Sequence, residues 1–255
     1  MPKHPKLHHF FWNSYYTPLI AVVLVAGIIL LLPKHKAEST HEVAVDHSAV
    51  TITTTDGIKL AATLKTPTKA TLAPVVILLH QYGYDRHEWD AYLQKFLDAG
   101  FITLSYDMRG FGQSPLKTIP ANQQDHLSSL IKDLPAVVAY VKTVPHVNAQ
   151  RITIVGASVG AGVAYVANGD ALGIHRTVLL SPTVIGIAFD GHTITNFLPT
   201  GVFGIASTSE QTDLTIFMSK VHDPKQQQIV PQGGHGVDLL KSPGVLESVI
   251  SWIKQ

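Results

Sequence analysis

Short hydrophobic blocks recur along most of the chain, and their period switches in turn between the two-residue repeat of strands and the 3.6-residue repeat of helices. Alternating residues at 49–55 and 58–64 flank Asp56-Gly57 and predict a β-hairpin. Further strands are predicted at 74–79, 101–106, 152–155, 176–181, 201–207 and 226–230. Helices are predicted at 85–99, 123–142 with a kink at Pro135, after Gly160, and at 242–254. Alternating strands and helices predict an α/β domain with a mostly parallel central sheet and helices on both faces.

The first 48 residues follow a different pattern. Residues 19–32 are uncharged and apolar, and with the aromatic residues from position 10 onward they are long enough for a transmembrane helix. We expect a basic flank at 1–9, a membrane anchor at 10–33, a polar linker at 34–48 and one domain at 49–255. A cleaved signal sequence is the alternative, although residues 35–37 form a poor cleavage site. The charges that flank the apolar segment slightly favour an orientation in which the 49–255 domain lies on the exported side, periplasmic or extracellular.

Composition narrows the class of function. A hydrophobic content of 45% supports a packed core, and the absence of cysteine excludes disulfides, thiolate zinc sites and a cysteine nucleophile. The formal net charge is +1, with four lysines and no acidic residue in positions 1–36. The remainder carries 15 basic and 18 acidic residues, which is not the basic footprint of a nucleic-acid-binding protein.

The most informative segment is Gly156-Ala-Ser158-Val-Gly160, which follows the short β-branched run 152–155. Strand, G-x-S-x-G and helix are the context of a nucleophile elbow, the sharp turn that lifts a serine hydroxyl off the sheet. The glycines leave room where a Cβ would clash. We therefore predict Ser158 as a nucleophile.

A serine hydroxyl needs a base, and the base needs a carboxylate that fixes its tautomer. His235 is the predicted base because it lies in the Gly233–Gly236 segment (the histidine turn), just after the last predicted strand. The acid is expected between the elbow and this histidine. Glu210 is favoured for its short distance from the strand that ends at Ser207, with Asp213 as the alternative acid and Asp190 on an earlier loop.

Oxyanion donors are expected from two loops. The elbow provides the Val159 N–H, and the His80–Gly83 segment (the oxyanion loop) is predicted to provide that of Tyr82 rather than that of Gln81. We expect His80 to anchor this loop. Asp107 and Arg109 are expected to hold the next loop by hydrogen bonds and an ion pair.

Together these motifs resemble the α/β-hydrolase superfamily over residues 49–255. The similar motifs are Val-Ile-Leu-Leu-His-Gln-Tyr-Gly (76–83), Tyr-Asp-Met-Arg-Gly-Phe-Gly-Gln-Ser (106–114), the elbow and Gly-Gly-His-Gly (233–236). The hairpin start and the small size are similar to the dienelactone-hydrolase-like and small carboxylesterase branches. The chain departs from the family pattern in two places. Gln81 replaces the usual glycine, and the segment 207–213 lacks the common Asp-x-Asp.

The motifs and the resemblance predict a serine hydrolase, carboxylesterase-like, with no metal or organic cofactor. Only about 18 residues separate Pro182 from Gly201, so no large cap is expected, and the substrate should be a small or short-chain acyl compound. Thioesterase, amidase or peptidase action would use the same residues. A catalytically silent, membrane-tethered binding module is the alternative from another class. A short-chain dehydrogenase is disfavoured because strands precede the glycine turn and the Tyr-x-x-x-Lys motif is absent downstream.

Overall fold

The computed structural model describes residues 45–255 except 117, 119, 170–171 and 184–198. These residues belong to one compact unit, 42–255. The predicted membrane anchor and basic flank lie outside the described residues and stay predictions, as does the absence of a large cap between 184 and 198. Every helix of the described part is too short or too polar to cross a bilayer.

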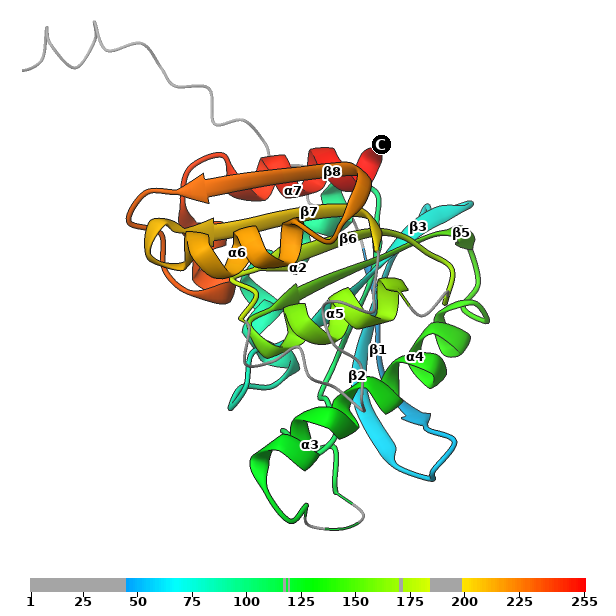
Figure 1. The fold of residues 1–255 in the computed structure, drawn as a ribbon. Coiled ribbons are helices and arrows are strands. Elements are labelled where there is room, and N and C mark those ends of the chain that lie inside the picture. Colours follow the sequence, from blue (N-terminus) through cyan, green and yellow to red (C-terminus); the bar gives the residue numbers. More distant parts are fainter. Residues whose placement is uncertain (1–44, 117, 119, 170–171, 184–198) are drawn as a thin grey trace, which may run out of the picture. The chain divides into compact units, whose positions relative to one another are not determined.

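The described part consists of eight strands and the helices that connect them (Figure 1). The strands are β1 (Val45–Thr53), β2 (Lys59–Pro67), β3 (Ala73–Leu79), β4 (Ile102–Tyr106), β5 (Val147–Ala157), β6 (Ile174–Leu180), β7 (Thr200–Ser207) and β8 (His222–Val230). The α-helices are α2 (Asp90–Asp98), α3 (Gln123–Leu130), α4 (Leu134–Val141), α5 (Val159–Gly169), α6 (Gln211–Met218) and α7 (Val245–Lys254). Short 3₁₀ helices are η1 (Arg86–Trp89), η2 (Ile131–Asp133), η4 (Thr208–Glu210) and η5 (Gly236–Lys241).

The strands form one sheet in the order β1-β2-β4-β3-β5-β6-β7-β8, from the hairpin at one edge to β8 at the other (Figure 1). The pairs β1–β2 and β2–β4 are antiparallel, and every pair from β4 to β8 is parallel. The expected mostly parallel sheet is therefore confirmed. Because the carboxyl ends of β3 to β8 share one edge, the loops that follow them meet there.

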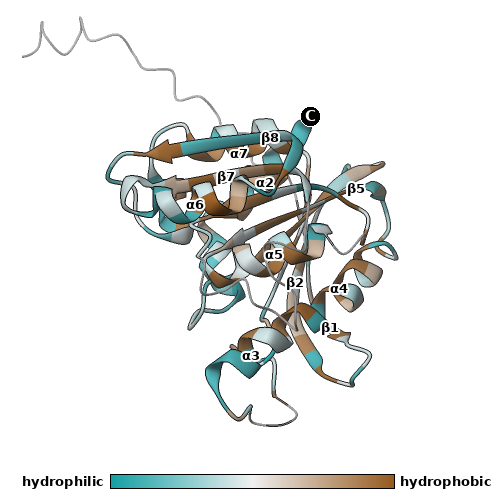
Figure 2. Cartoon of the chain, viewed as in Figure 1, coloured by the Kyte–Doolittle hydropathy of each residue, from teal (hydrophilic) through white to brown (hydrophobic). Residues whose placement is uncertain are grey.

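Alternate residues of the central strands pack against different helix layers, as the two-residue period of a strand requires. Val75, Ile77 and Leu79 belong to the cluster covered by α3, α4, α5 and α6. Val76 and Leu78 belong to the cluster covered by α2 and α7. Figure 2 shows hydrophobic residues, in brown, along much of the central strands and along helices α4 and α5. Helices thus cover both faces, as predicted.

Several element boundaries differ from the sequence prediction. The first strand begins at Val45, so the domain starts before residue 49 and the linker is shorter than predicted. The helix expected at 85–99 divides into η1 and α2, and the one expected at 123–142 divides into α3, η2 and α4. Pro135 lies in the first turn of α4, where its missing N–H costs no helical hydrogen bond.

The strand expected at 226–230 is longer and begins at His222. Its first six residues are exposed because β8 is an edge strand, so they carry no hydrophobic alternation (Figure 2). Helix α6 was not predicted, although Leu214, Phe217 and Met218 bury one helical face.

Candidate active site

The turn between β5 and α5 has the strained geometry expected of a nucleophile elbow. Ser158 is 9% exposed and has a φ of +53°, in the left-handed region that non-glycine residues rarely adopt. A Cβ on Gly156 would lie 2.2 Å from the carbonyl oxygen of Gly160. A Cβ on Gly160 would lie 2.6 Å from the carbonyl oxygen of Leu79. Gly156 is therefore required for the elbow to close onto the start of α5, and Gly160 for it to pack against the end of β3.

Replacing Gly160 with alanine is expected to destabilise the domain strongly. The added methyl group meets backbone atoms of Leu79 and His80, which cannot rotate away. We expect a loss of about 3 kcal/mol, or a melting temperature lower by about 6–12 °C. Gly244→Ala is the matched control, since a Cβ there meets nothing within 4 Å and only its φ of +78° is strained. Calorimetry that found equal, small shifts for both variants would contradict this packing argument.

A chain of hydrogen bonds connects the elbow to the histidine turn. The N–H of Ser158 donates to the carbonyl of Leu180 at 2.9 Å, at the end of β6. The next residue, Ser181, is fully buried, and its Oγ accepts the N–H of Gly236 at 2.8 Å. This hydrogen bond holds the turn that follows β8 against the end of β6, on the far side of β7. These contacts bring His235 to the side of the sheet edge where Ser158 lies.

Glu210 is the carboxylate that contacts His235. Its Oε1 lies in short contact with Nδ1 of His235. Its Oε2 accepts hydrogen bonds from Ser181 Oγ at 2.7 Å and from Ser207 Oγ at 3.0 Å. Ser207 and Glu210 also form a reciprocal capping box at the start of η4, which fixes the direction of the glutamate. Glu210 is thus held on one oxygen and faces the imidazole with the other.

These hydrogen bonds also determine the charge of Glu210. Burial by itself would raise the pKa of this carboxyl, but donors from Ser181, His235 and Ser207 outweigh it and hold the pKa below its ordinary value. Glu210 is therefore ionised at neutral pH. Asp213 lies in the first turn of α6, one helical turn further on, and in the described part of the chain it forms no hydrogen bond or ion pair with His235. Asp190 lies outside the described residues.

The oxyanion loop after β3 is anchored by His80. Its Nδ1–H donates to the carbonyl of Gln81 at 2.7 Å, and its Nε2 accepts the N–H of Met108 at 3.0 Å. Burial lowers the pKa of His80, so the ring is neutral at pH 7. The side chain is completely buried, which agrees with an anchoring role.

The two backbone donors of this loop are in different situations. The Gln81 N–H donates to Glu88 Oε2 at 2.9 Å, so it is already engaged. Neither the Tyr82 N–H nor that of Val159 has a hydrogen-bond partner among the described residues. Val159 is the first residue of α5, where N–H groups lack intrahelical partners and the helix dipole favours a negative charge. The Tyr82 N–H is therefore the free donor of this loop, and its role at an oxyanion stays a prediction.

Ion pairs hold the loop that follows β4, but Asp107 and Arg109 do not pair with each other. Asp107 binds the guanidinium of Arg86 and accepts the N–H of Gln113 at 2.7 Å. Arg109 binds the buried Asp133 at 2.6 Å and Asp56 at 2.7 Å.

The pKa values of the two partners of Arg109 move in opposite directions. Burial raises the pKa of Asp133 to about 6 despite the ion pair, whereas hydrogen bonds from Arg109 lower that of Asp56 to about 2. Sequence spacing gives no sign of these partners, or of the roles of Ser181 and Glu88.

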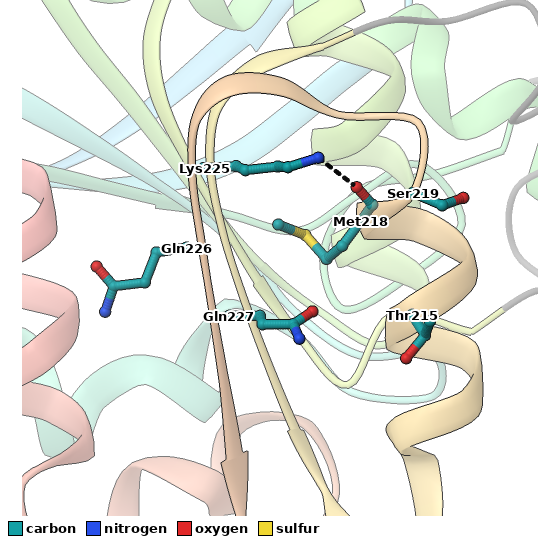
Figure 3. A pocket seen from close by; sticks show the side chains of 6 residues that line it. All are labelled: Thr215, Met218, Ser219, Lys225, Gln226 and Gln227. Atoms are coloured by element: carbon teal, nitrogen blue, oxygen red, sulfur yellow. Dashed lines mark hydrogen bonds between the residues drawn. The ribbon is translucent and has the colours of Figure 1, made fainter.

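A separate pocket of about 410 Å³ lies between α6 and β8 (Figure 3). No residue of the elbow, η4 or the histidine turn lines it. Its lysine, Lys225, donates to the carbonyl of Met218 at 3.3 Å and to that of Val221 at 2.9 Å, which caps the end of α6. In the part of the chain that the structure describes, no group of three or more His, Asp or Glu side chains could hold a metal ion.

The family model described as "Serine aminopeptidase, S33" matches residues 70–227, from the start of β3 into β8. The chain belongs to this family of α/β-hydrolases. The matched segment includes the oxyanion loop, the elbow and η4, and it ends within β8, before the histidine turn. The expected hydrolase class is confirmed.

Curated relatives match over shorter segments. The chain is similar to the quorum-quenching protein AidA of Acinetobacter baumannii, with 30% identity over 118 residues, 45% of this chain and 38% of AidA. It is also similar to the bifunctional esterase/perhydrolase DCH of Acinetobacter calcoaceticus, with 34% identity over 94 residues, 36% of this chain and 30% of DCH. The matched segments span about a third of the length of these two curated relatives.

Solved structures share the fold of this S33-family chain over most of the domain. The esterase Pf2001 of Pyrococcus furiosus aligns with a TM-score of 0.65 at 20% identity, covering 82% of this chain and 92% of the esterase. A dienelactone hydrolase of Anabaena variabilis aligns with a TM-score of 0.61 at 16% identity, covering 81% and 94%. At this identity the likeness to both structures concerns the fold alone.

Proposed function

We propose that the protein is a serine hydrolase that cleaves an ester or related acyl bond of a small or short-chain substrate. The observation that carries the proposal is the contact between Glu210 and His235. The turn of His235 is held at the end of β6 by the hydrogen bond from Gly236 to Ser181, and the N–H of Ser158 bonds to the preceding residue, Leu180. Because Nδ1 of His235 faces the ionised Glu210, Nε2 is the ring nitrogen left to accept a proton. The imidazole is 45% exposed, so substrate can reach it.

The proposed reaction has two halves. Ser158 Oγ forms a bond to the acyl carbon while its proton passes to Nε2 of His235. The oxyanion that results accepts hydrogen bonds from the N–H groups of Val159 and Tyr82. The bond to the leaving alcohol then breaks, and the alcohol takes the proton from His235. Water repeats the sequence on the acyl-enzyme, releases the acid and restores Ser158.

Comparing ester with amide substrates tests this proposal. We expect the purified protein to hydrolyse p-nitrophenyl acetate and butyrate with saturable kinetics, and faster than the p-nitroanilides of amino acids. The family description supports peptidase action, whereas the relative DCH and the esterase from Pyrococcus support ester cleavage. Faster anilide than ester turnover would assign the peptidase activity instead. A folded protein that turned over neither would contradict the proposed function.

We also propose that residues 10–33 anchor the protein in a membrane, with the domain on the exported side. This rests on the apolar run 19–32 and the aromatic residues before it. The full-length chain is expected to stay with the membrane fraction after alkaline carbonate extraction, and a chain lacking residues 1–37 is expected to be released. Release of both forms would contradict an anchor.

A further inference from the structure

Glu88, in η1, binds Gln81 of the oxyanion loop through both of its carboxylate oxygens. Oε2 accepts the Gln81 backbone N–H at 2.9 Å, and Oε1 accepts the side-chain amide Nε2. Gln81 is 8% exposed and Glu88 is half-buried, so water competes little for these bonds. Hydrogen bonds to a charged acceptor are roughly twice as strong as neutral ones. One side chain therefore fixes both the backbone and the side chain of Gln81.

The side chain of Gln81 also reaches the histidine turn. Its Oε1 lies against the backbone of Gly236, at 2.1 Å from where a Cβ of that residue would be. Gly236 has a φ of +59° and donates its N–H to Ser181. The glycine next to His235 is thus enclosed between Gln81 on one side and Ser181 on the other.

These contacts make Gln81 a link between two parts of the proposed mechanism. The residue after it provides the free Tyr82 N–H, and its side chain packs beside the residue that follows His235. The orientation of Gln81 therefore sets both the direction of an oxyanion donor and the position of the base. Glu88 determines that orientation without touching Ser158, His235 or Glu210 in any hydrogen bond of the described residues.

We propose that Glu88 is a positioning residue for the proposed acyl transfer, acting through Gln81 to align the Tyr82 N–H with the histidine turn. The proposal rests on the proposed function and adds a residue to it that belongs to none of the motifs in the sequence. Glu88→Ala leaves the Gln81 N–H and amide without their acceptor. Glu88→Gln retains one acceptor oxygen but turns an NH₂ group toward the Gln81 amide, so its effect should be intermediate.

The test compares Glu88→Ala, Glu88→Gln, Gln81→Ala and the double variant Gln81→Ala/Glu88→Ala with wild type in the full-length protein. Asp90→Asn is the matched control, because Asp90 is an exposed carboxylate of the adjoining helix that pairs with His87. We would measure kcat and KM for p-nitrophenyl butyrate. We would also measure the inhibition constant of a trifluoromethyl ketone, whose serine adduct carries an oxyanion, and the melting temperature of each variant.

Removing an oxyanion donor outright costs about 10²–10³-fold in kcat, so misaligning one should cost about 10–100-fold. We expect this loss in Glu88→Ala, with KM within about twofold of wild type and an inhibition constant that rises in parallel. A smaller loss is expected in Gln81→Ala, and the double variant should be little worse than Glu88→Ala, because the two residues act in one chain. Asp90→Asn should match wild type in every measurement.

Three results would overturn the proposal. The first is a lower melting temperature with unchanged kcat and inhibition constant, which would leave Glu88 a purely structural role. The second is independent, multiplicative losses in the double variant. The third is an absence of turnover in folded wild type, which would contradict the proposed function and this inference together. The first two results contradict this inference alone and leave the proposed function intact. If Glu88→Ala does not fold, Glu88→Gln and Gln81→Ala decide by the same measurements.

Discussion

Ester hydrolysis is expected to fall by about 10⁴-fold or more when Ser158 is replaced by alanine. The hydroxyl is the proposed nucleophile, and the remaining oxyanion donors cannot form an acyl-enzyme without it. The measurement is kcat for p-nitrophenyl butyrate at equal amounts of folded protein. The melting temperature should not fall, because alanine keeps the same backbone conformation and Ser158 Oγ makes no hydrogen bond among the described residues.

The control and the partner variant make this result specific. Ser219→Ala, beside the pocket between α6 and β8, should retain full activity. His235→Ala should lose activity to a similar extent, and the double variant Ser158→Ala/His235→Ala should be no worse than either, since the residues act as one unit. Turnover by Ser158→Ala within tenfold of wild type would exclude Ser158 as the nucleophile.

The second large effect is expected for Glu210→Gln, with a decrease in kcat of about 10²–10⁴-fold and little change in KM. Glutamine keeps the size of the side chain but removes the charge that stabilises the imidazolium, and its amide can present an N–H to the ring. The matched variant is Asp213→Asn, which removes the alternative acid one helical turn away and should stay within about twofold of wild type.

The pH dependence of stability gives an independent readout for the same residue. Because the folded-state pKa of Glu210 is lowered, its ionised form stabilises the fold above the ordinary value of 4.5, and this contribution is lost as the pH falls below it. Glu210→Gln should therefore lose less stability than wild type on acidification. Full activity in Glu210→Gln with a loss in Asp213→Asn would reverse the assignment of the acid.

The elbow and the parallel strands could be predicted because they depend on local sequence. The β-branched residues of β5 are followed by glycines that a sharp turn needs, and β3 is apolar throughout. The capping box Ser207-x-x-Glu210 can also be predicted, since Ser-x-x-Glu is a local motif. It is a second reason, besides the short distance from the strand, to favour Glu210 over Asp213. Helix α6 carries apolar residues at helical spacing, so it could also be predicted from the sequence.

The remaining features depend on contacts between residues far apart in the sequence. Ser181 follows β6, and it bonds to the histidine turn only because the segment after β8 extends past β7. Arg109 meets Asp56 and Asp133 only after the sheet has formed. The exposed half of β8 has no hydrophobic face to alternate, so its backbone pairing with β7 is invisible in the sequence. Glu88 acts on Gln81 through the turn into η1, for which the sequence offers no motif.

The most direct test of the central claim, a nucleophilic Ser158, is to label the folded wild-type protein with a fluorophosphonate and locate the adduct by mass spectrometry of peptides. We expect one adduct per chain, on Ser158, and slow or absent labelling in His235→Ala. An adduct on a different serine, or no adduct on folded wild type, would contradict the account.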